Sequence, residues 1–195
     1  AQSESAIAYP VEKIAAAATA DAGQAPAPLP ALDDSDNVAK DVIGAILNHD
    51  DFVRLLTPTS IVRRIVATID NLPRATLAPQ ISAVRPAAGS FATQSTTRGI
   101  AIAAGNGERY AAYVKAAESI DTQRLVGFYV RLYPLFQQAY AELGQPGRRF
   151  NDRLVEVIDH LLAAPSPRGE IRLVQPSVLY RYADETLEKS SSGHK

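Results

Sequence analysis

The chain has 195 residues, of which 46% are hydrophobic and 21% are charged, and its formal net charge is -1. This balance is typical of a soluble globular protein with one domain of ordinary size. A net charge so close to zero argues against a general nucleic-acid binder and against attachment to anionic lipid. Because cysteine is absent, disulfides, a thiol nucleophile and thiolate metal sites are excluded.

The first 31 residues differ in composition from the remainder. They are dominated by Ala, Pro, Ser and Gln and end in the segment GQAPAPLPAL. Alternating Ala and Pro favour extended conformations, and few large apolar side chains are present to offset the entropy of ordering. We expect residues 1–31 to form a flexible linker, with a short helix over Val11 to Ala20. A single domain is expected over residues 32–195.

Hydrophobic periodicity predicts two helices near the start of this domain. Asp34, Ser35 and Asp36 offer N-cap oxygens to the first of them. Its apolar face consists of Val38, Val42, Ile43, Ile46 and Leu47. A short helix is expected over Asp51 to Leu56.

Thr57-Pro58 then supplies a cap and a first-turn proline for the second helix, which ends at Pro73. Its buried face is expected to consist of Ile61, Val62, Ile65, Ile69 and Leu72. Arg63 and Asp70 are expected to point away from the core.

Extended structure is predicted in two places. A proline-punctuated connection over residues 74–86 precedes SFATQSTTRGIAIAAG, whose Thr, Ile and Phe between glycine turns indicate a short hairpin or edge ribbon. Glu170 to Val174 and Val178 to Tyr182 form two more short extended pieces. Asn106 is placed to cap the helix that follows the ribbon.

The strongest helical patterns are LVGFYVRLYPLFQQAYAELG and FNDRLVEVIDHLLAAP. The first helix is expected from about Asp121 to Leu143, with Pro134 on its outward face and Gly144 as its C-cap. Its apolar stripe consists of Leu125, Phe128, Tyr129, Leu132, Tyr133, Phe136, Tyr140 and Leu143. The second helix opens at Phe150 or Asn151, and its expected inward face is Leu154, Val157, Ile158, Leu161 and Leu162.

These elements predict a mainly α fold. It is a compact helical domain of about five to six helices with a small β hairpin or edge ribbon, preceded by the Ala/Pro-rich linker.

Catalytic and metal signatures are weak. Gly105-Asn106-Gly107 follows a strand and precedes a helix, but Tyr110 replaces the third glycine of a phosphate loop. His49 beside Asp50 and Asp51 lacks an evident third metal ligand. We therefore predict no cofactor, no metal and no enzymatic activity.

The remaining candidates for chemistry are isolated side chains. His160 is expected to be solvated on the polar side of its helix, and His194 lies in the polar segment SSSGHK. Ser190 to Ser192 are expected in a flexible terminus, and no GxSxG elbow occurs. Asp70 and Asp152 are carboxylates that the sequence cannot place together.

Asparagine recurs beside arginine at the ends of predicted elements. Guanidinium groups and amides at helix ends suit an anion or a peptide carboxylate, although they also satisfy orphan backbone groups there. The candidate ligand-binding residues are Asn71, Arg74, Asn106, Arg109, Asp152 and Arg153. Tyrosines suit half-buried partner contacts as well as cores, and the candidate partner surface is Tyr110, Tyr113, Tyr180 and Tyr182.

The order of several long segments resembles one family. These segments are LPALDDSD, IVATIDNLPR, NGERYAAYV, RLYPLFQQAYAELGQPGRRFNDRLVEVIDHLLAAP and LVQPSVLYRYADETLE. They resemble the proteobacterial family called domain of unknown function 3014, over roughly Leu29 to Lys195. That family has no assigned activity, so the resemblance implies no catalytic residue.

What the resemblance implies is a setting. Family members typically carry one transmembrane helix and an Ala/Pro-rich spacer before this domain, which faces the periplasm. No stretch here approaches the roughly 18 apolar residues that a span needs, so such an anchor would lie outside this chain. Members also continue beyond the position of Lys195, which leaves open whether the domain is complete there.

Three functions follow as expectations. The leading one is a non-catalytic interaction or scaffolding module of the Gram-negative envelope, on the periplasmic face of the inner membrane, with an envelope protein as partner. The second is a small-ligand sensor that uses the Asn/Arg residues. The third is a hydrolase that uses carboxylates and His160, which requires these groups to converge in a cleft.

Overall fold

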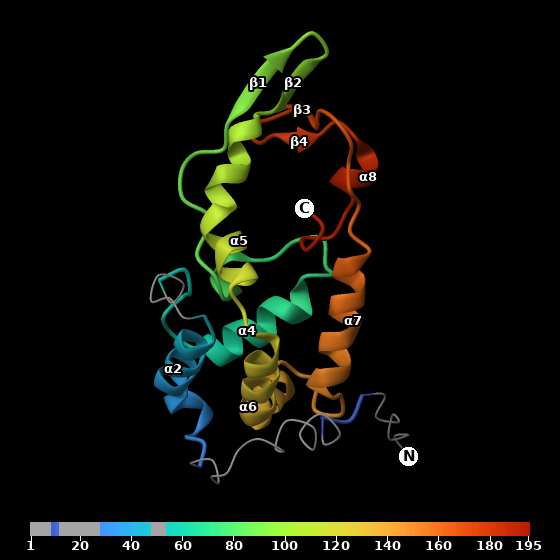
Figure 1. Cartoon of the computed structure of the whole chain (residues 1–195). Helices are drawn as coiled ribbons and strands as arrows, with labels where there is room; N and C mark the ends of the chain where they lie inside the picture. Colours follow the sequence, from blue (N-terminus) through green and yellow to red (C-terminus); the bar gives the residue numbers. More distant parts are fainter. Residues whose placement is uncertain (1–8, 12–27, 48–53) are drawn as a thin grey trace.

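Figure 1 shows the computed structural model of the chain, which describes residues 9–11, 28–47 and 54–195. Six α-helices and a four-stranded antiparallel sheet occur in these residues, which confirms the predicted mainly α fold with a small β element. The helices are α2 (Asp36–Leu47), α4 (Ile61–Asn71), α5 (Ala111–Glu118), α6 (Thr122–Glu142), α7 (Phe150–Leu162) and α8 (Glu185–Glu188). Three 3-10 helices accompany them, η2 (Leu32–Asp34), η3 (Pro79–Ile81) and η4 (Ala104–Tyr110).

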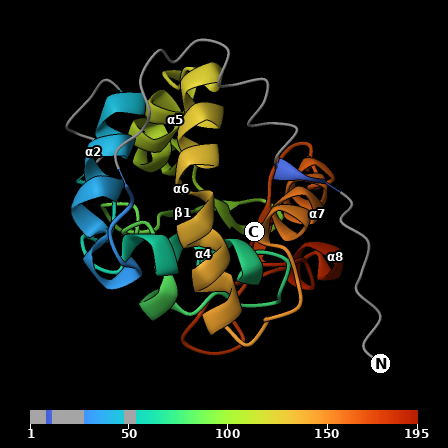
Figure 2. The same cartoon turned by 90° about the horizontal axis from the view of Figure 1, so that it is seen from below.

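Helix α4 lies at the centre of the helical part. It packs against α2, α6 and α7, an arrangement seen from below in Figure 2. Val62 and Val66 of α4 are almost completely buried, and they share a core with Phe136, Tyr140 and Phe150. The rings of Phe136 and Phe150 lie 5.7 Å apart, and those of Tyr140 and Phe150 lie 5.6 Å apart. Such contacts between aromatic rings add to the stabilisation from buried area.

Asp36 caps helix α4 rather than its own helix. Its carboxylate accepts hydrogen bonds from the backbone N–H groups of Ser60 (2.8 Å) and Ile61 (2.7 Å). A carboxylate at a helix N-terminus satisfies orphan donors and complements the helix dipole. The cap predicted at Thr57-Pro58 is therefore wrong, because α4 begins at Ile61 after Ser60, whose φ is 52°.

The ends of α6 are as predicted. The Asp121 carboxylate accepts from the backbone N–H groups of Gln123 and Arg124, and Gly144 has a φ of 87° just beyond the last turn. Pro134 is exposed, so its missing N–H faces solvent. The helix is most deeply buried in its C-terminal half, while Leu125 near its start is 42% exposed.

The four strands form one antiparallel sheet in the order β1 (Thr93–Thr96), β2 (Gly99–Ile102), β3 (Arg172–Val174) and β4 (Arg181–Tyr182). The predicted hairpin is β1–β2, with Gly99 at a φ of 112° after its turn. Leu173 of β3 lies opposite both Ile100 of β2 and Tyr182 of β4. The two later extended pieces therefore extend the predicted ribbon into a sheet. In Figure 1 this sheet lies at the upper end, with α2, α4 and α6 at the lower end.

Several side-chain predictions are wrong. Asp70 is buried rather than outward, because two arginines neutralise it within the protein. Ile158 and Leu162 face solvent, with Leu162 80% exposed, because α7 buries only the face that carries Phe150, Asn151 and Val157.

Two predicted helical segments also differ. Asn106 lies inside η4 and does not cap a helix. The short helix predicted over Asp51 to Leu56 lies partly outside the described residues, and Leu56 forms a β-bridge with Val84. The helix predicted over Val11 to Ala20 lies outside the described residues except for Val11.

The segment Ser191–Lys195 is docked rather than free, which corrects the expectation of a flexible terminus. The backbone N–H groups of Ser192 and Gly193 donate to the carbonyls of Arg74 (2.7 Å) and Leu72 (2.9 Å). These carbonyls follow the end of α4 and would otherwise lack partners. The end of the chain thus lies between α4 and the sheet (Figure 1).

Candidate functional site

Arg74 and Arg153 converge on the carboxylate of Asp70. Arg153 Nε donates to Asp70 Oδ1 (2.9 Å) and Arg74 Nη2 donates to Asp70 Oδ2 (2.9 Å). Arg153 also donates to the Asp70 carbonyl (2.7 Å) and to Glu156 Oε2 (3.1 Å). The group joins the C-terminal end of α4 to α7 and to the residues just beyond α4.

The charges of this group are balanced within it. Burial lowers the pKa of Arg153, but the hydrogen bond and charge of Glu156 together with those of Asp70 outweigh burial and raise the pKa above its ordinary value. Both carboxylate oxygens of Asp70 accept hydrogen bonds from arginines of the protein. A group so fully paired is suited to joining helices and leaves little capacity for a ligand.

Asp152 lies next to Arg153 in the first turn of α7 but has a different partner. Its Oδ1 accepts from the backbone N–H of Tyr9 (2.9 Å), and Asn151 Nδ2 donates to the carbonyl of Tyr9 (2.8 Å). Asn151 Oδ1 in turn accepts from the Tyr129 hydroxyl (2.7 Å). Asn151 and Asp152 therefore hold the backbone of the chain's own residue 9.

The other predicted ligand-binding side chains serve nearby backbone. Asn106 Nδ2 donates to the carbonyls of Ala92 (2.6 Å) and Ala103 (2.8 Å), and its Oδ1 accepts from the N–H of Ala92 (3.0 Å). Arg109 Nε donates to the Ala88 carbonyl, and Asn71 Nδ2 donates to the carbonyl of the residue four positions earlier. Each satisfies a loop or a helix end.

The predicted Asn/Arg cluster is therefore not one site. Only Arg74 and Arg153 share a partner, while Asp152 binds Tyr9 and Arg109 binds residues 87 and 88. Neither of the two cavities described below is lined by any of these six residues.

His160 is packed rather than solvated. Its Nε2 lies 2.8 Å from Ser191 Oγ, and its ring stacks on that of His194 with centroids 4.0 Å apart. His194 Nε2 lies 2.6 Å from the His160 carbonyl. The Ser–His distance suits proton transfer, but Ser191 is buried and no described carboxylate bonds the His160 ring.

The described residues show no grouping of metal-binding side chains. Among the described residues, no three His, Asp or Glu side chains gather as metal ligands would. His49, Asp50 and Asp51 lie outside the described residues.

Two of the four predicted tyrosines line a cavity at the sheet, which we call the sheet cavity. It has a volume of ≈ 520 Å³, and Tyr180 and Tyr182 line it. The remaining lining residues are Phe91, Ile102, Leu173, Val178, Leu179, Arg181, Glu188 and Lys195. Apolar side chains thus make up much of the lining, and Arg181, Glu188 and Lys195 add charge.

One aromatic pair lies at this cavity and another lies at the junction of η4 and α5. The ring centroids of Phe91 and Tyr180 are 6.2 Å apart, and those of Tyr110 and Tyr113 are 6.4 Å apart. Burial, then the charges of Glu188 and Tyr110, raise the pKa of Tyr182, so Tyr110 lies within electrostatic reach of the cavity. Tyr113 donates its hydroxyl to the Arg85 carbonyl (2.7 Å).

Two residues at this cavity were missed by sequence reasoning. Val178 is 88% exposed and Leu179 is 73% exposed, in the loop between β3 and β4. The sequence predicts that they belong to an extended piece from Val178 to Tyr182. In the structure, the strand begins only at Arg181. The signal present was Pro176, which rarely belongs inside a paired strand.

Comparison with known proteins identifies a family, but this family has no assigned activity. Neither the curated proteins nor the solved structures contain a detectable match to the chain. The helices of the described residues include none with the length and apolar character of a membrane span. The model of the family described as protein of unknown function (DUF3014) matches residues 61–195, which include α4, the sheet, α5 to α8 and the docked segment. Since this match covers more than half of the sequence, the chain belongs to the DUF3014 family.

Proposed function

We propose that the protein is a non-catalytic interaction module whose sheet cavity, with Val178 and Leu179, binds an apolar segment of a partner protein. The observation that carries the proposal is the exposure of these two neighbouring aliphatic side chains beside an aromatic-lined cavity. Apolar side chains stabilise a fold by being buried, so the exposure of both side chains does not contribute to the free energy of folding.

The chemistry around them resembles the anatomy of a protein interface. An apolar and aromatic centre is formed by Phe91, Leu173 and Tyr180, and charged side chains lie at Arg181 and Glu188. Interfaces commonly combine such an apolar centre with a polar rim. The cavity is larger than one side chain needs, so a segment with two or more apolar residues suits it.

The edge of the sheet supports a side-chain mode of binding over strand addition. The outward N–H of Tyr182 in β4 already donates to Glu188 Oε2 (3.0 Å). A carboxylate in this position occupies the hydrogen-bonding group that an added strand would use. The partner is therefore expected to insert side chains into the cavity.

We further propose the setting that the family resemblance implies. The module would be held at the periplasmic face of a Gram-negative inner membrane by an anchor outside this chain, with the Ala/Pro-rich first residues as spacer. Fusing a phosphatase that folds only in the periplasm to Lys195 of the native gene product tests this. Activity in cells supports the setting, and an inactive but intact fusion contradicts it.

The test of binding is site-specific photocrosslinking in cells that express the native gene. A photoreactive amino acid at Leu179 should give a discrete adduct with one protein, because that side chain lies at the cavity. The same amino acid at Leu162, which is 80% exposed on α7, is the matched control and should give none. Identical adducts at both positions would contradict the proposal.

A second variant separates partner binding from self-association. Val178→Asp with Leu179→Glu should leave the free energy of unfolding within about 0.5 kcal/mol, since both side chains are exposed. It should abolish the adduct formed from a third probe position at Phe91. If light scattering shows instead that the unmodified protein is a dimer and the double variant a monomer, the partner is a second copy and the proposal is wrong.

A further inference from the structure

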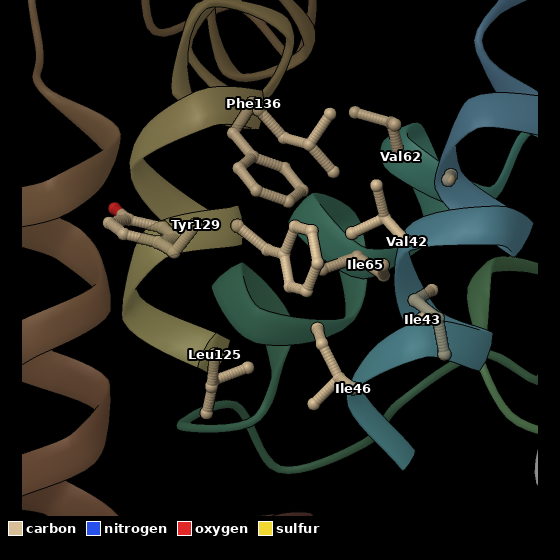
Figure 3. Close-up of a pocket in the computed structure, with 11 residues that line it drawn as sticks. Val42, Ile43, Ile46, Val62, Ile65, Leu125, Tyr129 and Phe136 are labelled. Atoms are coloured by element: carbon tan, nitrogen blue, oxygen red, sulfur yellow. The ribbon is translucent and has the colours of Figure 1, made fainter. Parts of the chain in front are cut away.

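A second cavity lies between three helices of the bundle, away from the sheet. We call it the helix cavity. It has a volume of ≈ 200 Å³ and is lined by Val42 and Ile46 of α2, by Val62 and Ile65 of α4, and by residues of α6 that include Phe128. Figure 3 shows these side chains pointing toward a common space from the three helices.

Among the described residues, the lining offers no free hydrogen-bonding group. Its side chains are aliphatic or aromatic, and the one hydroxyl among them belongs to Tyr129. That hydroxyl donates to Asn151 Oδ1 (2.7 Å), and in Figure 3 it points away from the other labelled side chains. Water gains little in such a space because it needs two or more polar partners. The cavity therefore suits an occupant that has no polar atoms in its inserted part.

The size of the cavity limits that occupant. A cavity of about 150 Å³ with apolar walls accommodates benzene, which has six carbons. By proportion, ≈ 200 Å³ accommodates about eight carbons. A protein segment entering this deeply would bring backbone amides that the apolar walls leave without hydrogen-bond partners, which is unfavourable. A hydrocarbon chain carries no such cost.

The cavity also has an entrance. Leu125, at the start of α6, lines it and is 42% exposed, and Ile43 of α2 lines it and is half-buried. An elongated ligand can thus place its tail among the three helices while a polar head remains in solvent. This geometry differs from that of the sheet cavity, whose lining includes charged side chains.

We propose that the helix cavity binds a hydrocarbon chain of about eight carbons, supplied either by a free fatty acid or by the acyl chain of a membrane lipid. This proposal is independent of the partner site at the sheet, since the two cavities share none of the lining residues that the structure describes. It assigns the protein a lipid-type ligand in addition to a protein partner.

The first experiment is calorimetric titration of the whole chain with straight-chain alkanoates. Each added methylene should tighten binding about fourfold from butanoate to octanoate, because each transfers one more group out of water. The gain should stop beyond about eight carbons, since further methylenes remain outside. Absence of octanoate binding up to millimolar concentration, or affinity without chain-length dependence, overturns the proposal.

A substitution that fills the cavity provides the structural control. Val42→Phe places a phenyl ring in the space and should weaken octanoate binding at least tenfold. Leu162→Phe, on the exposed face of α7, is the matched control and should bind octanoate as the unmodified chain does. If Val42→Phe fails to fold by circular dichroism, Ile65→Phe fills the same cavity from a half-buried position. Unchanged affinity in a folded filling variant contradicts the assignment.

Vesicles distinguish the two sources of the chain. Flotation with neutral phosphatidylcholine vesicles should carry the protein upward if membrane lipid supplies the chain, and octanoate should compete it off. No flotation, together with octanoate binding that Val42→Phe removes, assigns a free fatty acid. Flotation that neither octanoate nor Val42→Phe reduces shows attachment elsewhere and counts against the cavity.

Discussion

Replacing Gly193 with alanine is expected to destabilise the protein by loosening the docked segment Ser191–Lys195. A Cβ at this position would lie 2.6 Å from Leu161 Cδ2, 3.1 Å from the Leu72 carbonyl oxygen and 3.2 Å from Leu72 Cβ. The Leu161 methyl can rotate away. The Leu72 carbonyl cannot, because it accepts the hydrogen bond from the Gly193 N–H itself (2.9 Å).

The loss in free energy of unfolding can be estimated for two cases, in which the segment either stays docked or detaches. Overpacking a close contact typically costs about 1–3 kcal/mol. If the segment detaches instead, the loss is that of the backbone hydrogen bonds from Ser192 and Gly193, at about 0.5–1.5 kcal/mol each. Both routes give about 1–3 kcal/mol, so the prediction does not depend on which one the protein takes.

The assay is urea unfolding followed by far-ultraviolet circular dichroism, with Gly147→Ala as the matched control. Nothing lies within 4 Å of a Cβ at Gly147, so that variant should be unchanged or slightly more stable. Amide hydrogen exchange at Ser192 and Gly193 should accelerate only in Gly193→Ala. Equal stability of the two variants would refute the close packing of this segment against α4 and α7.

Further substitutions test single buried groups. Tyr140 is fully buried and its hydroxyl has no hydrogen-bond partner among the described residues, so Tyr140→Phe should raise the free energy of unfolding by about 1 kcal/mol; a decrease would indicate a hidden partner. Tyr129→Phe should lower it by about 1 kcal/mol, because the hydroxyl then no longer donates to Asn151. Asp70→Ala should cost about 3 kcal/mol by removing the two charged hydrogen bonds that Arg74 and Arg153 make to its buried carboxylate, whereas Glu185→Ala at an exposed ion pair should cost under about 0.5 kcal/mol; similar losses would contradict the buried role of Asp70. Burial, followed by the charges of nearby groups, raises the pKa of Tyr129 above its ordinary value near 10, so its stability contribution is complete below pH 10 and is lost as pH rises through the raised pKa. The urea midpoint should therefore fall as pH rises above about 10, and it should fall less in Tyr129→Phe.

The sequence alone determined the four main helices and some of their ends, but not α8 or the start of α4. Periodicity placed α2, α4, α6 and α7, and short-range chemistry placed the Gly144 turn, whereas the Asp121 cap was seen only in the structure. These features depend on residues within a few positions of one another, so a single segment contains all the information they need. The β1–β2 hairpin was predictable for the same reason.

Only the tertiary structure decided the contacts between residues that lie far apart in the sequence. The cap of α4 comes from Asp36, and the carboxylate of Asp70 meets Arg153 from another helix. The sheet is completed by β3 and β4, which lie far along the chain from β2. No local pattern encodes such a pairing, because it depends on how helices pack and where loops return.

The candidate sites divide in the same way. Tyr180 and Tyr182 were predictable as surface tyrosines, but their convergence with Phe91 was not. The Asn/Arg residues satisfied the same local criteria, but the structure separates them. They form hydrogen bonds either with nearby backbone or with the buried carboxylate of Asp70. The apolar residues around the helix cavity read as ordinary core in sequence, and only the packing of three helices leaves space between them. Composition decides which chemistry is present, and long-range packing decides which residues can act together.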